Sequence, residues 1–310
     1  MYPQGCGGSS PFFGTNFFVM ALGGPPLNER RRYQLLILTR MAATLDQIVA
    51  DARLRLEERR NRVPLARLEA QAAAHEARGF AAALRQKASP GPAVIAELKK
   101  ASPSRGVIRA SFHAASLARE LEAGWAAALS VVTDEDHFQG SLTYLDEAEA
   151  AARLPLLRKD FIVDEFQVLE ARAHGADAVL LIVAALTDDE LKKLARSVRE
   201  LGLDALCEVH DERELSRALD HDFDIIGVNS RDLRTFAVDR ERPFELAMRL
   251  PRHVLKVAES GLTRGREMAE LRAAGYDAFL IGETLMRADH PGEKLAQMVS
   301  EARRERAWTA

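Results

Sequence analysis

The sequence predicts a closed (β/α)8 barrel, an α/β fold also known as the TIM barrel, that follows an N-terminal helical extension. Eight short apolar segments recur along the chain, at intervals of roughly 25 residues as in strand–helix repeats. The stretches between them carry apolar residues at helical spacing. Near-continuous apolar strands that alternate with helices indicate a parallel sheet covered on its outer face. An open, doubly wound sheet shows the same alternation, but the count of eight favours closure.

The first predicted strand shows how each unit ends. The apolar run from Ala93 to Ala96 leads into Glu97 and Lys99, and residues two apart on a strand share one face. The loop that follows, SPSRG, is rich in hydrogen-bonding groups. The other predicted strands begin at or near residues 127, 156, 178, 205, 225, 257 and 277. Most of them also end on a polar or ionisable residue.

The predicted helices are amphipathic. The clearest one runs from Asp188 to Leu201 and places apolar residues on one side, namely Leu191, Leu194, Ala195 and Val198. A strand–helix repeat of this kind continues to the end of the chain, so we expect the barrel domain to span 93–310.

The region before the barrel divides into two parts. Residues 1–40 are rich in Gly, Pro, Ser and Asn, and we interpret them as a disordered tail or an over-extended gene start, with Met41 as a plausible true start. Residues 41–92 form the predicted extension. Its first helix runs from Thr44, which caps it together with Gln47, to Arg60, and a second begins at about Pro64. The extension is able either to close the bottom of the barrel or to reach over its top.

Composition excludes several classes of protein. The chain has 310 residues, of which 47% are hydrophobic and 29% charged, as in ordinary globular proteins. The net charge of -3 gives no electrostatic reason to expect nucleic acid or membrane as partners. No run reaches the roughly 18 apolar residues of a membrane span. Cys6 and Cys207 do not make a disulfide framework, and Cys207 should face the helical layer. These features fit a cytoplasmic protein.

A candidate active site follows from the barrel itself. In such barrels the functional side chains lie at the carboxyl ends of the strands. Six polar groups fall there: Glu97, Lys99, Lys159, Glu208, Asn229 and Glu259. Interleaved lysines and carboxylates allow acid and base chemistry at neutral pH. Taken singly, each is more often a solvated charge, and Asn229 could equally be a turn residue.

A phosphate site is expected beside these groups. Gly261 follows the seventh strand and Gly282-Glu283 follows the eighth, where barrels bind phosphate through backbone N–H groups. Ser102 adds a hydroxyl. The Glu283 side chain should point away from an anion, so only its backbone is assigned to the phosphate. The sequence alone therefore predicts a barrel enzyme that acts on an anionic small molecule.

Other chemistries lack their signatures. The eight histidines show no metal-binding spacing, and His113 and His210 are expected at helix starts, as caps or on the surface. Ser260 does not lie in a nucleophile elbow. No dinucleotide fingerprint follows the first strand.

Several motifs carry a resemblance to a known family. They are AELKKASPS (96–104), LSVVTD (129–134), FQGS (138–141), LRKDF (157–161), GVNSRDL (227–233) and AESG (258–261). From about Leu45 to the C-terminus, in this order, the chain resembles indole-3-glycerol phosphate synthase. That resemblance implies a carboxy-lyase of tryptophan biosynthesis, which converts 1-(2-carboxyphenylamino)-1-deoxyribulose 5-phosphate to indole-3-glycerol phosphate, carbon dioxide and water. It implies no metal and no organic cofactor.

The resemblance also implies roles for the polar groups. Lys159 is the general acid, and we expect burial and a nearby cation to lower its pKa. Lys99 holds the substrate carboxylate and is positioned by Glu97. Glu208 is the base of the dehydration step. Asn229 and Glu259 orient the substrate hydroxyls and the lysines.

The remaining site residues are expected to bind the substrate. They are Ser102, Ser260, Gly261, Gly282, Glu283, Phe138, Phe161, Leu180, Arg231 and Leu233. An aromatic substrate needs such an apolar wall, although the apolar members could also be core. Expected partners are the phosphorylated substrate and other enzymes of the tryptophan pathway, with the chain a monomer or weak homo-oligomer. Two alternatives stay open at this point: another phosphosugar barrel, such as the isomerase that precedes this step, and a catalytically silent binding module.

Overall fold

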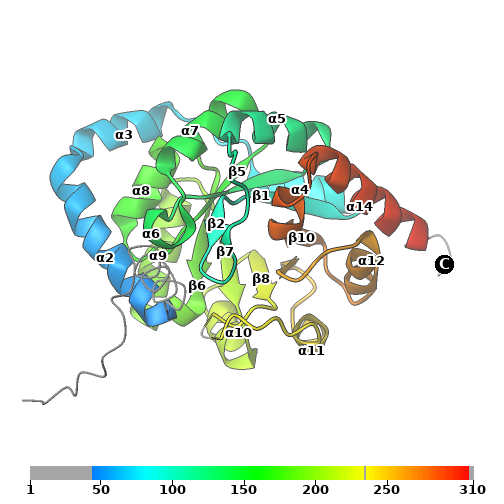
Figure 1. The fold of residues 1–310 in the computed structure, drawn as a ribbon. Helices are drawn as coiled ribbons and strands as arrows, with labels where there is room; N and C mark the ends of the chain where they lie inside the picture. Colours follow the sequence, from blue (N-terminus) through cyan, green and yellow to red (C-terminus); the bar gives the residue numbers. More distant parts are fainter. Residues whose placement is uncertain (1–43, 234, 307–310) are drawn as a thin grey trace, which may run out of the picture. The chain divides into compact units, whose positions relative to one another are not determined.

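The computed structural model describes residues 44–233 and 235–306 and shows a closed barrel of eight parallel strands (Figure 1). The barrel strands are β1 (Ala93–Leu98), β4 (Ala128–Val132), β5 (Leu156–Lys159), β6 (Ala178–Ile182), β7 (Asp204–Val209), β8 (Ile225–Asn229), β9 (Leu255–Glu259) and β10 (Ala278–Ile281). Each strand pairs with the next one along the chain, and β10 pairs with β1 to close the ring. The prediction of a (β/α)8 barrel is confirmed.

Helices cover the outside of this ring. They are α5 (Ala114–Ala123), α7 (Leu142–Ala151), α8 (Glu165–Ala173), α9 (Asp188–Glu200), α10 (Glu212–Leu219), α11 (Arg242–Ala247), α12 (Gly265–Ala273) and α14 (Pro291–Arg306). Shorter helical turns follow three strands: α6 (Glu135–Phe138), η1 (Val183–Ala185) and α13 (Glu283–Met286). Within the described part of the chain, no helix combines the length and the apolar character needed to cross a membrane.

Helix α9 agrees closely with the sequence pattern. It begins after Thr187, whose hydroxyl accepts from the backbone N–H of Glu190 while the Glu190 carboxylate accepts from the backbone N–H of Thr187. Such a capping box satisfies backbone donors that would otherwise lack partners. The four apolar residues expected on one side of this helix are all buried.

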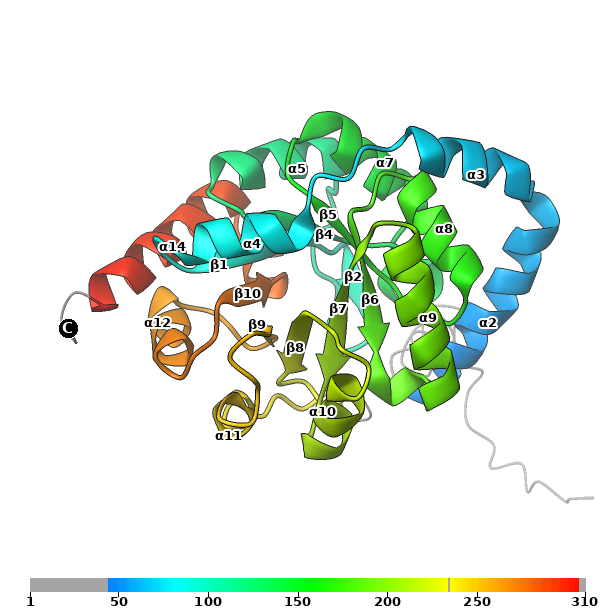
Figure 2. The same ribbon diagram turned by 180° about the vertical axis from the view of Figure 1, so that it is seen from behind.

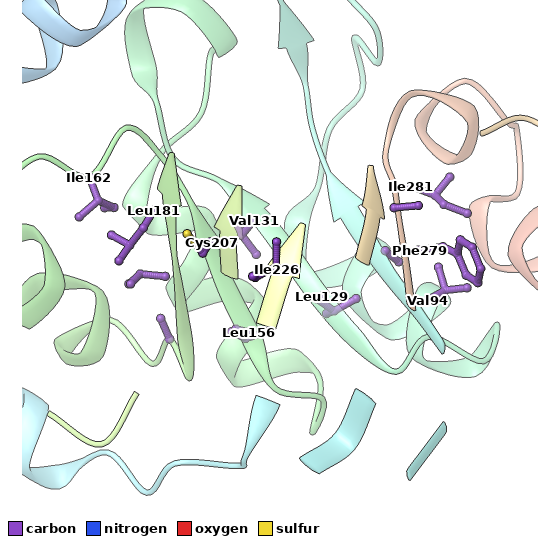
Figure 3. Close-up of a cluster of buried hydrophobic side chains, with 14 of the residues drawn as sticks. Val94, Leu129, Val131, Leu156, Ile162, Leu181, Cys207, Ile226, Phe279 and Ile281 are labelled. Carbon is purple, nitrogen blue, oxygen red and sulfur yellow. The ribbon is translucent and has the colours of Figure 1, made fainter. Parts of the chain in front are cut away.

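Two apolar layers result from the alternation of side chains along the strands. Residues that face the barrel axis, such as Ile95, Leu157 and Leu206, form the inner layer. Their neighbours point outward and pack beneath the helices (Figure 3); examples are Val94, Leu156 and Cys207. Cys207 is fully buried in this outer layer, as predicted.

The N-terminal extension contributes three helices, α2 (Leu45–Arg62), α3 (Leu65–Ala74) and α4 (Phe80–Ala88). The N-cap of α2 is confirmed, because the Thr44 hydroxyl accepts from the backbone N–H of Gln47. Figures 1 and 2 show α2 and α3 along one side of the barrel and α4 across its strands. The expectations for residues 1–40, Cys6 and Met41 lie outside the described residues.

Helices α4 and α2 reach opposite ends of the barrel. Phe80 and Leu84 of α4 join the inner layer next to Ala93, the first residue of β1. Ile48 and Ala52 of α2 join the same layer. Arginines of α2 pair with acidic residues in the loops after the strands: Arg55 with Asp134 and Asp136, and Arg60 with Asp164. The extension therefore closes the bottom of the barrel and also reaches its top.

The loop after β1 is more regular than its composition suggested. It contains a small antiparallel pair, β2 (Ala101–Ser102) and β3 (Gly106–Val107). Gly106, at the turn, has a positive φ of 64°, a conformation that glycine adopts without steric cost. This short hairpin holds the SPSRG segment over the carboxyl end of β1.

Candidate active site

A cavity of about 420 Å³ lies at the carboxyl ends of the strands. All of the residues predicted for the site line it. They are Glu97, Lys99, Ser102, Phe138, Lys159, Phe161, Leu180, Glu208, Asn229, Arg231, Leu233, Glu259, Ser260, Gly261, Gly282 and Glu283. They come from all eight strands or from the loops after them, so they gather only because the barrel closes.

The register of the strands explains why the polar groups meet. Lys159, Asn229 and Glu259 are the last residues of β5, β8 and β9, and Asn229 is paired directly with Glu259. Glu208 lies opposite Ile182 at the end of β6. Each of them occupies an inward-facing position, two residues beyond a side chain or glycine of the inner layer. The polar site thus sits directly on top of the apolar core.

Lys159 is the centre of a buried ion cluster. Its Nζ lies 2.8 Å from Oε2 of Glu208 and 3.3 Å from Oε2 of Glu259. Burial by itself disfavours the ammonium, yet the carboxylates of Glu208, Glu259 and Glu97 outweigh it and raise the pKa of Lys159. The expectation of a lowered pKa is therefore wrong, because the close neighbours of Lys159 are anions and not a cation.

The pKa values of the two carboxyl groups that contact Lys159 are shifted in opposite directions. Burial disfavours both carboxylates, but the ammonium of Lys159 and the imidazole of His210 lower the pKa of Glu208. For Glu259, burial and the negative charge of Glu208 exceed the attraction of Lys159 and raise the pKa to about 8. At neutral pH the cluster therefore contains an ammonium, a carboxylate and a neutral carboxylic acid within contact of one another.

A second ion pair lies on β1. Nζ of Lys99 is 2.6 Å from Oε1 of Glu97, whose side chain is almost fully buried while that of Lys99 is 19% exposed. The Glu97 carboxylate fits over Gly282, where an added Cβ would lie 2.2 Å from Oε1. Gly227 makes similar room for Glu259, with an added Cβ only 2.1 Å from its Oε1. Both glycines leave the space that the carboxylates occupy.

Asn229 supports the loop that follows β8. Its Oδ1 accepts from the backbone N–H of Arg231 at 2.9 Å, so the turn-forming role is present even though the residue also lines the cavity. Arg231 in turn donates from Nη1 to the carbonyl of Phe236 at 3.0 Å. The asparagine thus fixes the start of a loop whose arginine faces the cavity.

The opposite side of the cavity has the features of an anion site. Ser260 and Gly261 follow β9 with positive φ angles of 66° and 77°, and Gly282 precedes α13.

Glu283 lies among three arginines that line the same cavity. Its Oε1 is 3.2 Å from Nε of Arg105 and 3.0 Å from Nε of Arg287, and its Oε2 is 3.8 Å from Nη2 of Arg231. The charge of Glu283 is thereby neutralised. Arg105 and Arg287 were not predicted, since nothing in a loop or helix sequence distinguishes them from surface arginines.

An apolar wall completes the cavity. The rings of Phe138 and Phe161 lie with their centroids 6.2 Å apart and tilted by 40°. Leu180 of the inner layer and Leu233 from the loop after β8 line the same space. Phe161 and Leu180 also belong to the core, so for them the structural and the site interpretations hold together.

His210 does not lie where it was expected. It is 7% exposed and does not cap α10, whose N-cap is Asp211. Its Nε2 is 3.4 Å from Oε1 of Glu208, and its Nδ1 is 3.0 Å from Oε2 of Glu214. The signal was present in the sequence, because His210 comes two residues after Glu208, the same spacing that linked Glu97 to Lys99.

The described residues contain no group of three or more His, Cys, Asp or Glu side chains arranged to hold a metal ion. What the cavity offers is ammonium and guanidinium donors, carboxyl groups in two protonation states and an apolar wall. Such a set can bind an anionic aromatic molecule and move protons on it.

Comparison with known proteins adds a family to this geometry. The family model for indole-3-glycerol phosphate synthase matches residues 45–298. The chain is 53% identical to an indole-3-glycerol phosphate synthase of Koribacter versatilis, over 84% of this chain and 100% of that protein. It is 49% identical to an indole-3-glycerol phosphate synthase from Acidithiobacillus ferrooxidans, over 83% of this chain and 99% of that protein. A thiamine phosphate pyrophosphorylase from Pyrococcus furiosus shares the fold alone, with a TM-score of 0.51 at 18% identity over 71% of this chain and 98% of that one.

Proposed function

The chain belongs to the indole-3-glycerol phosphate synthase family, and we propose that the cavity at the carboxyl ends of its strands carries out that family's ring closure. It is a carboxy-lyase of tryptophan biosynthesis. The substrate, 1-(2-carboxyphenylamino)-1-deoxyribulose 5-phosphate, loses carbon dioxide and water and becomes indole-3-glycerol phosphate. The observation that carries the proposal is the contact of Lys159 with Glu208 and Glu259 inside a cavity that also has an apolar wall and an arginine-rich rim.

Lys159 is the general acid of the ring closure. Its raised pKa keeps it fully protonated at neutral pH, which is the state that an acid needs. The ammonium donates its proton to the ribulose carbonyl oxygen as the aromatic carbon attacks the carbonyl carbon. A substrate oxygen that replaces one carboxylate at Nζ removes an ion pair, so the pKa of Lys159 falls when the proton is needed.

Lys99 binds the leaving carboxylate of the substrate, and Glu97 positions Lys99. Lys99 is the more exposed member of its ion pair, and its ammonium has donors to spare beyond Glu97. The substrate carboxylate binds there until its carbon–carbon bond breaks, carbon dioxide leaves and the ring becomes aromatic again. Glu97 keeps Lys99 pointing into the cavity.

Glu208 is the base of the dehydration. It takes a proton from the closed ring while the hydroxyl group leaves as water, protonated by the ammonium of Lys99, since Lys159 has given up its own proton in the ring closure. Glu259, whose pKa is raised to about 8, and Asn229 orient the substrate hydroxyls and the lysine. Backbone amides of Gly261 and Gly282 with the hydroxyl of Ser102 bind the phosphate, helped by Arg231.

The decisive experiment combines substrate and a single substitution. Purified protein is mixed with the carboxyphenylamino ribulose phosphate, and indole fluorescence is followed. Lys159→Met should lower the rate by about a hundredfold or more, since a positioned acid contributes on that scale. Lys193→Met, which removes an exposed lysine paired with Glu165 on the outer helices, is the matched control and should leave the rate unchanged.

The outcomes separate the alternatives. Isomerisation of a phosphosugar by the wild-type chain, without indole fluorescence, would favour the isomerase, which needs no clamp for a substrate carboxylate. Normal turnover by Lys159→Met with unchanged thermal stability would remove Lys159 from the role of acid. Retained phosphate binding by that variant would show that its cavity still folds.

The organisation of the protein is part of the same proposal. We assign 93–310 to the catalytic barrel and 41–92 to its extension. We propose that the chain is a monomer or weak homo-oligomer. We also propose that it acts in the cytoplasm, alongside other enzymes of the tryptophan pathway. Size-exclusion chromatography and cell fractionation test these two points.

A further inference from the structure

His210 is a buried ionisable group for which the proposed reaction has no use, although it touches the proposed base. It is the residue after the end of β7, and its ring lies between two carboxyl groups. Glu208 contacts Lys159 through Oε2, so its other oxygen, Oε1, is the one that faces His210. The two cations thus hold opposite oxygens of the same carboxylate.

The neighbours of the ring determine its protonation. The charged groups that face His210 are Glu208 of β7, two residues before it, and Glu214 on α10. Arg217 of the same helix binds elsewhere, to the carbonyls of Val183 and Leu186. Ionised carboxylates only accept hydrogen bonds, so an imidazole between two of them must carry a proton on both nitrogens. His210 is therefore an imidazolium.

Glu214 fixes the ring in place. One of its oxygens, Oε2, accepts both from Nδ1 of His210 at 3.0 Å and from the backbone N–H of His210 at 2.8 Å. The Glu214 backbone is itself held by the N-cap Asp211. The ring is thus tied to α10, and its Nε2 is a buried donor with no hydrogen-bond partner, 3.4 Å from Glu208.

We propose that His210, held by Glu214, is a positioning residue that orients the Glu208 carboxylate and keeps it ionised as the base of the proposed reaction. This inference rests on the proposed function. It explains how Glu208 stays charged when a substrate draws Lys159 away, because a second cation remains on the other oxygen. The pKa of His210 agrees with this role, because burial disfavours the imidazolium but the two carboxylates raise its pKa to about 10.

Two variants separate the charge of the ring from its shape. His210→Gln keeps an N–H donor toward Glu208 but removes the positive charge. Glu214→Gln keeps an acceptor for Nδ1 but removes the negative charge that retains the proton on the ring. His174→Gln is the matched control, since His174 pairs with Asp146 at 2.7 Å on the outer helices.

The pH profile of kcat/KM is the first readout. Loss of a positive charge that lies within a few ångströms of a carboxylate raises the pKa of that carboxylate by about one to three. The acid limb, which reports the base, should therefore move to higher pH in His210→Gln, with kcat about tenfold lower and KM unchanged. His174→Gln should keep the wild-type profile. An unmoved acid limb would overturn the proposal, as would a uniform loss of activity that follows a lowered melting temperature.

The second readout does not depend on activity. Nitrogen NMR of the labelled histidine should show a doubly protonated His210 ring through pH 8.5 in the wild type, and loss of a ring proton at lower pH in Glu214→Gln. A His210 that titrates near its ordinary value of about 6.5 in the wild type would refute the inference. Failure of the wild-type chain to form product would refute the proposed function instead and would leave this measurement intact.

Discussion

Gly227→Ala adds a single methyl group beneath the ion cluster and tests how its geometry supports catalysis. The new Cβ would lie 2.1 Å from Oε1 of Glu259 and 3.2 Å from Cδ1 of Leu206. Both contacts are with side chains, and the nearer one is the end of a flexible chain. We therefore expect strand β8 to keep its place and the Glu259 carboxylate to turn away from Lys159.

The structure sets the size of the effect. The contact of Glu259 with Lys159, at 3.3 Å, is charge-assisted, and such bonds contribute about 1.5 to 3 kcal/mol. Since about 1.36 kcal/mol is a factor of ten in rate, the loss of that contact lowers kcat/KM roughly ten- to 150-fold. Over-packing costs about 1 to 3 kcal/mol of folding stability. Replacing a glycine by alanine also stabilises the folded state by about 0.4 to 1 kcal/mol, because it reduces the conformational entropy of the unfolded chain. The variant should therefore fold.

Indole fluorescence gives the rate, and urea unfolding gives the stability of the same sample. Gly91→Ala is the matched control, because its new methyl group, just before β1, meets Nε of Arg303 at 2.6 Å, and Arg303 is an exposed side chain whose guanidinium lies over the ring of Trp125, away from the cavity. That variant should retain wild-type kcat/KM. Full activity in Gly227→Ala, at wild-type stability, would show that the position of Glu259 is irrelevant to turnover.

Two further predictions concern stability. Arg158→Met removes the guanidinium that holds the buried carboxylates of Asp160 and Glu170 at 2.9 and 3.0 Å, and should lower the free energy of unfolding in urea by about 3 to 5 kcal/mol. Arg196→Met, at an exposed pair, should change it by less than about 1 kcal/mol, and equal effects would contradict the reasoning. His210 has a raised folded-state pKa, so its contribution is fully present below about pH 6.5 and is lost as pH rises toward 10. The stability difference between wild type and His210→Gln should therefore shrink from pH 6 to pH 9.5, and a constant difference would contradict the raised pKa.

Local patterns were enough to predict the barrel. Each strand is a short apolar run, and the positions at which side chains face inward follow from the two-residue period. That period also placed Glu97 and Lys99 together and sent Cys207 outward. The polar groups assemble because a parallel barrel puts every carboxyl end on one rim, a property of the topology and not of exact distances.

What the sequence could not predict is the identity of neighbours across the ring. The pKa of Lys159 depends on Glu208 and Glu259, which approach it from other strands, and the sign of the shift was wrong for that reason. The spacing of His210 from Glu208 was visible in the sequence, but the second partner, Glu214, could be recognised only once α10 was placed beside the end of β7. Arg105 belongs to the site through the hairpin after β1, which composition described only as a loop.

The distribution of charge in the cavity bears on how a substrate arrives. The deep groups balance, since Lys99 faces Glu97, Lys159 faces Glu208, and Glu259 holds a proton near neutral pH. The surplus of positive charge lies at the rim, where three arginines surround the single carboxylate of Glu283. This surplus attracts the phosphate end of a phosphate ester that diffuses toward the cavity. Added salt should slow this capture while leaving the chemistry that follows unaffected.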